Sequence, residues 1–163
     1  GRVDAAQVEA AAREALAPFE RGGAGDGSDG PFQIQAELQD GMQDLVGIVR
    51  RANEIDQALE RIAALRARAA RVAVPGNRAY NPGWHTALDL KGLLTVAEAI
   101  TRSAADRRES RGAHFREDYP AKDDAAGRLL TVIRRGPDGE MRLARAPLRE
   151  PPAELQAIIR EMK

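Results

Sequence analysis

The sequence predicts a mostly α-helical protein: a bundle of three main helices, packed up and down like a spectrin repeat, with a small C-terminal β-hairpin and a short tail helix. Three observations support this fold class. Apolar residues recur at spacings of three and four in three consecutive long segments, and such one-sided stripes need partners. Two β-forming runs around a glycine-rich turn follow Pro120. A pair of prolines then opens a final amphipathic segment.

The chain divides into three predicted units. Residues 1–31 comprise an N-terminal helix and a glycine-rich linker, residues 32–120 the three-helix bundle, and residues 121–163 the hairpin and tail helix. The first helix, residues 4–20, can be capped by Asp4, and Gln7 three residues later completes a capping-box pattern. The linker holds five glycines in nine residues, 22–30, and is expected to be mobile.

Residues 25–30 of this linker match the G-x-G-x-x-G dinucleotide fingerprint. That fingerprint binds a pyrophosphate only between a strand and a helix. Here a predicted helix precedes it and Pro31 follows it, while Asp26 and Asp29 would repel phosphates. We therefore expect no cofactor to bind there.

The three bundle helices are predicted from their apolar stripes. The first stripe is Ile34, Leu38, Met42, Leu45, Val46 and Val49. The second, expected to begin at a cap on Asn53, is Ile55, Leu59, Ile62, Leu65, Ala69 and Val72. The third, which follows a turn at residues 81–84, is Leu90, Leu93, Leu94, Ala97, Ile100 and Ala104. A basic last turn, residues 107–111, and a stop at Gly112 are expected to end this third helix.

The last unit is predicted from turn chemistry. Residues 129–134 and 141–146 are the expected strands, and the sequence Gly-Pro-Asp-Gly at residues 136–139 is the turn that joins them. The tail helix begins at the proline pair, residues 151–152, and its apolar face is Leu155, Ile158, Ile159 and Met162.

Composition argues against several classes of function. The 25 basic and 25 acidic residues cancel, so there is no basic excess for nucleic acid, and the arginines of the second helix are read as a solvated face. Without cysteine the chain has no thiolate nucleophile or cysteine-ligated cluster, and His85 and His114 are too few for a histidine-built metal site. No run approaches the roughly 20 apolar residues of a membrane span, so no direct membrane insertion is expected.

Polar residues are densest in residues 107–120, which hold four arginines, three acids, a serine, a histidine and a tyrosine. Such a cluster could be catalytic, or it could fix the helix exit, a role that suits the arginine fork. Ser110 and His114 are separated by the expected helix stop, and no third residue orients them. We expect Arg111, His114 and Arg116 to form an interface or structural network that pairs partly with a missing domain, because few local acids are evident.

Residues 109–120, ESRGAHFREDYP, resemble a signature near the end of succinate dehydrogenase and fumarate reductase flavoprotein subunits. Residues 39–50 resemble an earlier helix of that family with a V-G-I-x-R ending, and residues 88–99 resemble its leucine-rich helix. Residues 81–85 resemble a variant with longer loops. Order and spacing agree with the family across residues 32–120.

The resemblance implies succinate–fumarate oxidoreduction, in either direction, with FAD in the full-length subunit. It places the FAD and substrate sites upstream, so this chain alone is expected to be inactive, with no catalytic, cofactor or metal residues. The implied partners are the N-terminal FAD-binding and capping domains of the same polypeptide and an iron–sulfur subunit. The implied location is cytoplasmic, at the inner face of the plasma membrane, through the full complex.

Two other interpretations stay open. L-aspartate oxidase shares the V-G-I-x-R and E-S-R-G features, although Ala113 and Arg116 favour the dehydrogenase. A free-standing helical interaction module could instead use the apolar face of the tail helix as its contact surface.

Overall fold

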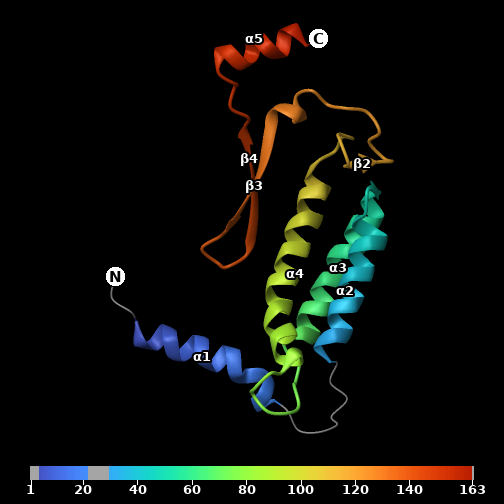
Figure 1. Cartoon of the computed structure of the whole chain (residues 1–163). Helices are drawn as coiled ribbons and strands as arrows, with labels where there is room; N and C mark the ends of the chain where they lie inside the picture. Colours follow the sequence, from blue (N-terminus) through green and yellow to red (C-terminus); the bar gives the residue numbers. More distant parts are fainter. Residues whose placement is uncertain (1–3, 22–29, 163) are drawn as a thin grey trace.

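The computed structural model describes residues 4–21 and 30–162. It is rich in helix and carries a small antiparallel hairpin, which confirms the broad fold class (Figure 1). The helices are α1 (Ala5–Glu20), α2 (Pro31–Val46), α3 (Ala52–Ala69), α4 (Pro82–Asp106), the 3-10 turn η1 (Ala126–Arg128) and α5 (Ala153–Glu161). The strands are β1 (Val49–Arg50), β2 (Phe115–Arg116), β3 (Leu129–Arg135) and β4 (Met141–Pro147). The glycine stretch predicted to be mobile, with its G-x-G-x-x-G pattern, lies outside the described residues except for Gly30.

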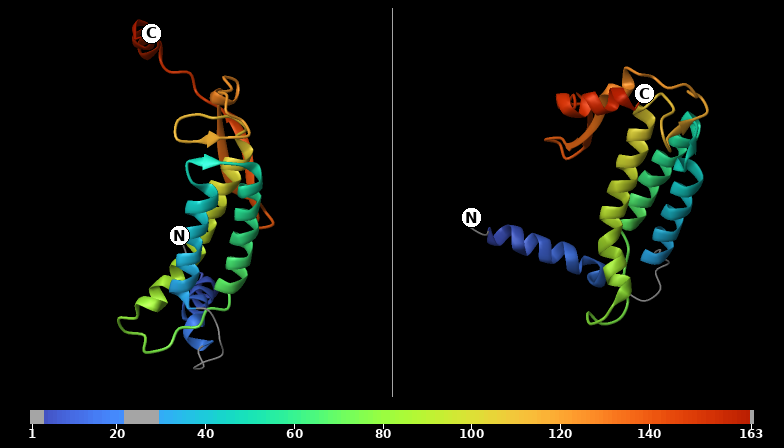
Figure 2. Two further views of the ribbon diagram at one scale, coloured as in Figure 1. Left: turned by 90° about the vertical axis from the view of Figure 1, so that its right-hand side faces the viewer. Right: turned by 45° about the horizontal axis from the view of Figure 1, so that its top comes forward.

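Helices α2, α3 and α4 lie side by side and contact one another pairwise (Figures 1 and 2). The buried cluster between them is Ile34, Leu38, Ile62, Leu65, Val72, Val74, Leu90, Leu94 and Ala97. A second cluster, near the exit of α4, is Val46, Ile55, Ala58 and Ala104. Burying each large aliphatic side chain stabilises the fold by roughly 1.5–3 kcal/mol, so these stripes hold the bundle together.

The starts of α1 and α4 carry side-chain caps, from Asp4 and Asn81, and the predicted starts of α3 and α4 need correction. The Asn81 side chain accepts a hydrogen bond from the Trp84 N–H at 3.0 Å, and Pro82 occupies the first position of α4, so the predicted turn is itself the first turn of the helix. The predicted cap on Asn53 is wrong. Helix α3 begins at Ala52 after an extended Arg51, whose side chain makes no capping bond.

Two of the predicted helix ends are also wrong. Helix α2 ends at Val46, and Val49 belongs to β1. Strands β1 and β2 pair in parallel, with Val49 opposite Phe115, and this pairing was not predicted. Helix α4 ends at Asp106, so residues 107–111 form a loop instead of a last helical turn. Gly112, with φ of +59°, lies in a turn of that loop and is not the helix stop.

The stripe predicted for α4 is partly on the wrong face. Leu93 and Ile100 are 38% and 46% exposed, while Thr101 takes a fully buried place toward α2. The buried Thr101 hydroxyl has a hydrogen-bond partner, because it donates to the Ala97 carbonyl at 2.8 Å. The spacing rule alone could not decide which side of a broad apolar arc faces the core.

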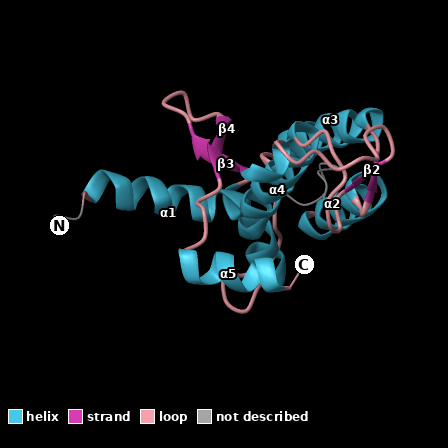
Figure 3. Ribbon diagram, turned by 90° about the horizontal axis from the view of Figure 1, so that it is seen from above, coloured by secondary structure: helices cyan, strands magenta, loops and turns pink. Residues whose placement is uncertain are grey.

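The other elements extend from the bundle. Helix α1 reaches away from the rest of the chain (Figures 1 and 3). It is held at the start of α4 by the Trp84 indole N–H, which donates to the Ala15 carbonyl at 2.7 Å. The hairpin is tied to the end of α4 where Arg145 pairs with Asp106 at 3.0 Å. Helix α5 follows the hairpin, and its apolar side chains are exposed. Within the described residues, no helix combines the length and apolarity of a membrane span.

Candidate functional site

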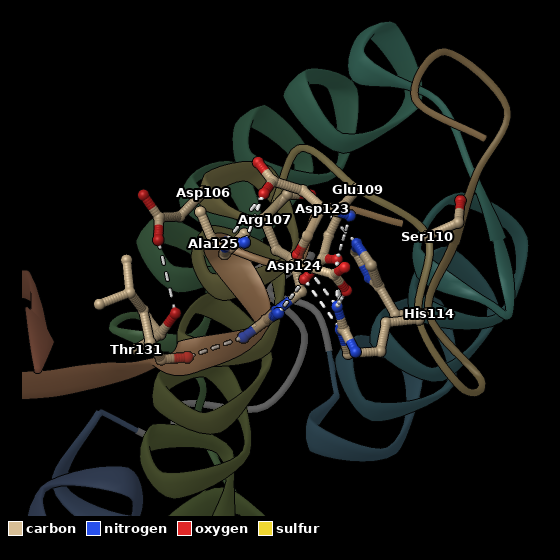
Figure 4. A network of polar contacts seen from close by, with 12 residues as sticks. Asp106, Arg107, Glu109, Ser110, His114, Asp123, Asp124, Ala125 and Thr131 are labelled. Carbon is tan, nitrogen blue, oxygen red and sulfur yellow. Dashed lines mark hydrogen bonds and ion pairs between the residues drawn. The ribbon is translucent and has the colours of Figure 1, made fainter. Parts of the chain in front are cut away.

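Residues 107–128 leave α4 and fold around one carboxylate before entering β3 (Figure 4). That carboxylate, Glu109, is fully buried. It accepts hydrogen bonds from the guanidinium of Arg107 and from Nε of Arg111, which lies 3.2 Å from each carboxylate oxygen. The backbone N–H of Asp123 donates to the same carboxylate at 2.9 Å. Donors from both halves of the loop therefore converge on one buried anion.

These donors keep the buried carboxylate ionised. The hydrogen bond from Arg111 lowers the pKa of Glu109 from 4.5 to about 2, with further help from the Asp123 N–H and Arg107, although burial alone would raise it. The same arginines also bind carbonyls: Arg107 donates to Leu129 at 3.2 Å, and Arg111 to Asp123 at 2.9 Å. The cluster thus fastens the exit of α4 to the beginning of the hairpin.

Arg116, in β2, returns the loop to the end of α4. Its side chain is only 2% exposed, and its fork binds both carboxylate oxygens of Asp118 at 2.7 and 2.6 Å. Its Nη1 donates to the Ala104 carbonyl at 2.9 Å, and its guanidinium lies 5.0 Å from the centre of the Tyr119 ring. Carbonyls in a last helical turn lack a helical partner, so Arg116 caps α4 from ten residues beyond its end.

Ser110 and His114 are both committed to structural hydrogen bonds. The Ser110 hydroxyl accepts from the Arg116 N–H and donates to the Tyr119 carbonyl, both at 2.9 Å. His114 Nδ1 accepts from the Arg50 guanidinium at 2.5 Å, which places the imidazole proton on Nε2. That Nε2–H faces the Arg107 carbonyl at 3.1 Å.

This arrangement leaves the cluster without the parts of a nucleophilic site. Ser110 and His114 bond to different groups and not to each other, so the serine has no base to activate it. Within residues 4–21 and 30–162, no group of three histidine, aspartate or glutamate side chains is placed to hold a metal ion. The geometry favours a structural role for the loop.

The three residues singled out from the sequence, Arg111, His114 and Arg116, meet in this loop around the exit of α4. The expectation that they would find few acids within the chain is wrong, because Glu109 pairs with Arg111 and Asp118 pairs with Arg116. The contribution of Arg107 and Arg50 was missed. The sequence did hold a signal for Arg107, because Arg107 and Arg111 lie two residues before and after Glu109. No local pattern indicated that Arg50 would contact His114.

The half-buried imidazole of His114 predicts a pH dependence of the stability. Burial lowers the pKa of His114 below 6.5, and the charges of Arg50, Arg116 and Arg107 lower it further, against the raising effect of the bond to the Arg107 carbonyl. The unfolded chain therefore takes up this proton first as the pH falls, so the stability due to neutral His114 is complete above about pH 6.5 and declines below it. Above pH 7 the melting temperatures of wild type and His114→Gln should depend on pH in the same way. From pH 6.5 to 5 the melting temperature of wild type should fall faster than that of the variant.

The comparisons with known proteins agree with this architecture. Residues 35–160 match the family model described as fumarate reductase flavoprotein C-term. The chain is 35% identical over 134 residues to the fumarate reductase flavoprotein subunit of Mycobacterium tuberculosis, covering 80% of this chain and 23% of that protein. It is also 32% identical over 108 residues to L-aspartate oxidase of Streptomyces coelicolor, covering 66% and 18%.

Solved structures give the same result. Mycobacterium smegmatis Sdh1 in complex with UQ1 superimposes with a TM-score of 0.83 at 39% identity, over 91% of this chain and 25% of that one. A variant of the FrdA chain of E. coli quinol fumarate reductase superimposes with a TM-score of 0.70 at 27% identity, over 94% and 27%. The chain thus spans about a quarter of the length of the relatives it matches. It belongs to the family of fumarate reductase flavoprotein C-terminal domains.

Proposed function

We propose that this chain is the C-terminal helical domain of a succinate dehydrogenase or fumarate reductase flavoprotein subunit, and that it supports succinate–fumarate oxidoreduction by the complete FAD enzyme. The observation that carries the proposal is the family match across residues 35–160. The loop around Glu109 is consistent with a supporting role, because Ser110, His114 and Arg116 are engaged in holding the chain in shape.

In this proposal residues 32–120 form an up-and-down bundle like a spectrin repeat, with the linker unit before it and the hairpin and tail helix after it. The network of Arg111, His114 and Arg116 fixes the loop that follows α4. The domain therefore keeps one conformation at the surface that it presents to its partners. The partners are the FAD-binding and capping domains of the same polypeptide and an iron–sulfur subunit. One related structure is a complex with UQ1 and another contains menaquinol molecules, which supports a location at a membrane through the full complex. We place the domain at the inner, cytoplasmic face of the plasma membrane.

L-aspartate oxidase is the second candidate, because one such enzyme is 32% identical to this chain. That match covers 108 residues, whereas the fumarate reductase match covers 134. Arg116 also favours the first proposal, since it belongs to the signature at residues 109–120 that resembles the dehydrogenase and fumarate reductase subunits. A polypeptide that contains this chain should therefore reduce a dye with succinate and should not form peroxide from L-aspartate.

The isolated 163-residue chain is expected to be colourless, to bind no FAD and to show no succinate-dependent dye reduction. The physical reason is that the glycine fingerprint carries two aspartates that oppose a pyrophosphate, and that Ser110 and His114 of the polar cluster are engaged in structural hydrogen bonds. An absorbance spectrum, a titration with FAD and a dye assay on the same preparation test this. The matched sample is the longer polypeptide, which should be yellow and active. Tight FAD binding or turnover by the isolated chain would contradict the proposal.

A further inference from the structure

Arg50 carries a positive charge that no carboxylate of the described chain balances. Its side chain is half-buried at the end of β1. Its Nε donates to the Val46 carbonyl at 3.2 Å and its Nη1 to neutral His114 at 2.5 Å, and neither partner is an anion. The other ionic groups around it include the like charge of Arg116. Arginine cannot relieve an unpaired charge by losing its proton, so a partly buried one gains from an external anion.

The Arg50–His114 pair opens onto a groove of about 450 Å³ between α4 and the hairpin. Its lining combines apolar side chains with Arg50, Arg107, His114 and one serine; the apolar residues are Ala99, Ile100, Ala104 and Ile133, and the serine is Ser103. None of the described residues that line the groove is acidic. An apolar groove with a positive rim fits an apolar surface that brings its own carboxylate.

The groove continues into an exposed apolar stripe on α4. Leu93, Val96 and Ile100 are 38%, 58% and 46% exposed, and their spacing of three and four places them on one side of the helix. They lie beside the core-facing residues of the same helix, so the apolar arc of α4 is wider than α2 and α3 cover. Contiguous exposed apolar residues next to an unbalanced charge indicate an interaction surface.

We propose that this surface, Leu93, Val96, Ile100 and the Arg50–His114 rim, docks on the FAD-binding part of the same flavoprotein subunit, and that an aspartate or glutamate of that part pairs with Arg50. The inference rests on the proposed function, which supplies that partner. This chain matches about a quarter of the length of its relatives, and the other three quarters of each relative lie on the same polypeptide. Such a tethered partner needs little affinity of its own, because its effective concentration is high.

Charge complementarity selects this occupant over a second copy of the chain. In a two-fold contact the same patch faces itself, and the groove offers no carboxylate to the partner's Arg50. In our proposal the docked FAD-binding part contributes this acid. This assigns the contact to Arg50 and the outer face of α4, whereas Arg111 and Arg116 are already paired within the chain.

Photo-cross-linking in the full-length subunit tests the inference. A benzoylphenylalanine at position 96 should cross-link to a peptide of the FAD-binding part, upstream of residue 1. The matched control carries the same group at position 64, where Ala64 is exposed on α3, and should give no such product. Arg50→Glu should abolish the position 96 cross-link, and changing the acid in the cross-linked region to arginine should restore it.

The other outcomes separate the alternatives. A product of twice the subunit mass from position 96 would mean that a second copy occupies the face. A rise in the melting temperature of the isolated chain with millimolar succinate, lost in Arg50→Ala, would make the groove a small-anion site instead. A cross-link of equal yield from positions 96 and 64 would also overturn the inference. If the full-length polypeptide contained no flavin, the proposed function would fail, whereas a flavin-containing subunit without the cross-link would contradict only the docking surface.

Discussion

Glu109→Gln should lower the free energy of unfolding by roughly 3 kcal/mol, the lower end of the cost of removing one partner from a buried ion pair. The amide has nearly the same shape as the carboxylate, so no cavity forms. The loss is electrostatic: Arg107 and Arg111 keep their positive charges beside a neutral group, and the Asp123 N–H loses a charged acceptor. The melting temperature should fall by about 6–12 °C in a chain of this size.

The matched control is Glu117→Gln, the same chemical change in the same segment. Glu117 pairs with Arg51 at 2.5 Å, but both side chains are well exposed, so we expect a loss of no more than about 1 kcal/mol. Denaturant unfolding of wild type and both variants gives the comparison. Equal effects from the two substitutions would show that burial of Glu109 adds nothing, and the loop would not be the anchor of the α4 exit.

The effect of Glu109→Gln should also depend on pH. The pKa of Glu109 is lowered from 4.5 to about 2 in the folded chain, so the stability due to its carboxylate is fully present above about pH 4.5 and is lost as the pH falls toward 2. The gap between wild type and variant should therefore be largest near neutral pH and should narrow from pH 4.5 to 2. A gap that stayed constant through this range would assign the loss to packing and not to the ionised carboxylate.

Local patterns were sufficient to predict the elements that local physics determines. The stripes of Leu38, Leu65 and Leu90 follow the helical period, and all three are buried in the core. The cap on Asp4 and the turn at residues 136–139 depend on neighbours within four residues, and both form as predicted. The predictions fail where the conformation of a segment depends on contacts with residues far away in the sequence. Val46 and Val49 continue a helical spacing, yet β1 instead pairs with a strand 66 residues later.

The candidate site shows the same division. Its residues were predicted as a group because their density along the sequence is unusual, but their partners were not. The end of α4 lies at Asp106, where the guanidinium of Arg116 caps the Ala104 carbonyl from beyond the loop. The basic residues before Gly112 were therefore a misleading signal for the helix end. Arg50 entered the site through the pairing of β1 with β2, and a two-residue strand has no periodicity to reveal it.

Arg116→Ala should lower the free energy of unfolding of the isolated chain by roughly 3 kcal/mol, in contrast to the small effect expected if this arginine faced another domain. Three losses combine. Asp118 loses both hydrogen bonds of the arginine fork, the Ala104 carbonyl loses its donor, and the ring of Tyr119 loses the cation that lies against it. A buried acceptor without a partner alone costs about 1–3 kcal/mol.

Arg116→Lys separates charge from geometry. Lysine keeps the positive charge that Asp118 requires but cannot bind both carboxylate oxygens and the Ala104 carbonyl at once, because it lacks the planar fork. We expect it to retain part of the stability, between wild type and Arg116→Ala. The control is Arg142→Ala, which removes an arginine from an exposed ion pair with Asp138 and should cost less than about 1 kcal/mol.

Amide hydrogen exchange locates the effect of Arg116→Ala. Because Arg116 joins β2 to the end of α4, its loss should speed the exchange of the Phe115 and Glu117 N–H groups, which bond to the Ile48 and Arg50 carbonyls. The hairpin amides, which depend on the pairing of β3 with β4, should change much less. If Arg116→Ala melted like Arg142→Ala, with exchange at Phe115 unchanged, the arginine would not be an internal tie. Its role would then lie in contacts outside this chain, as the density of basic residues in the sequence first suggested.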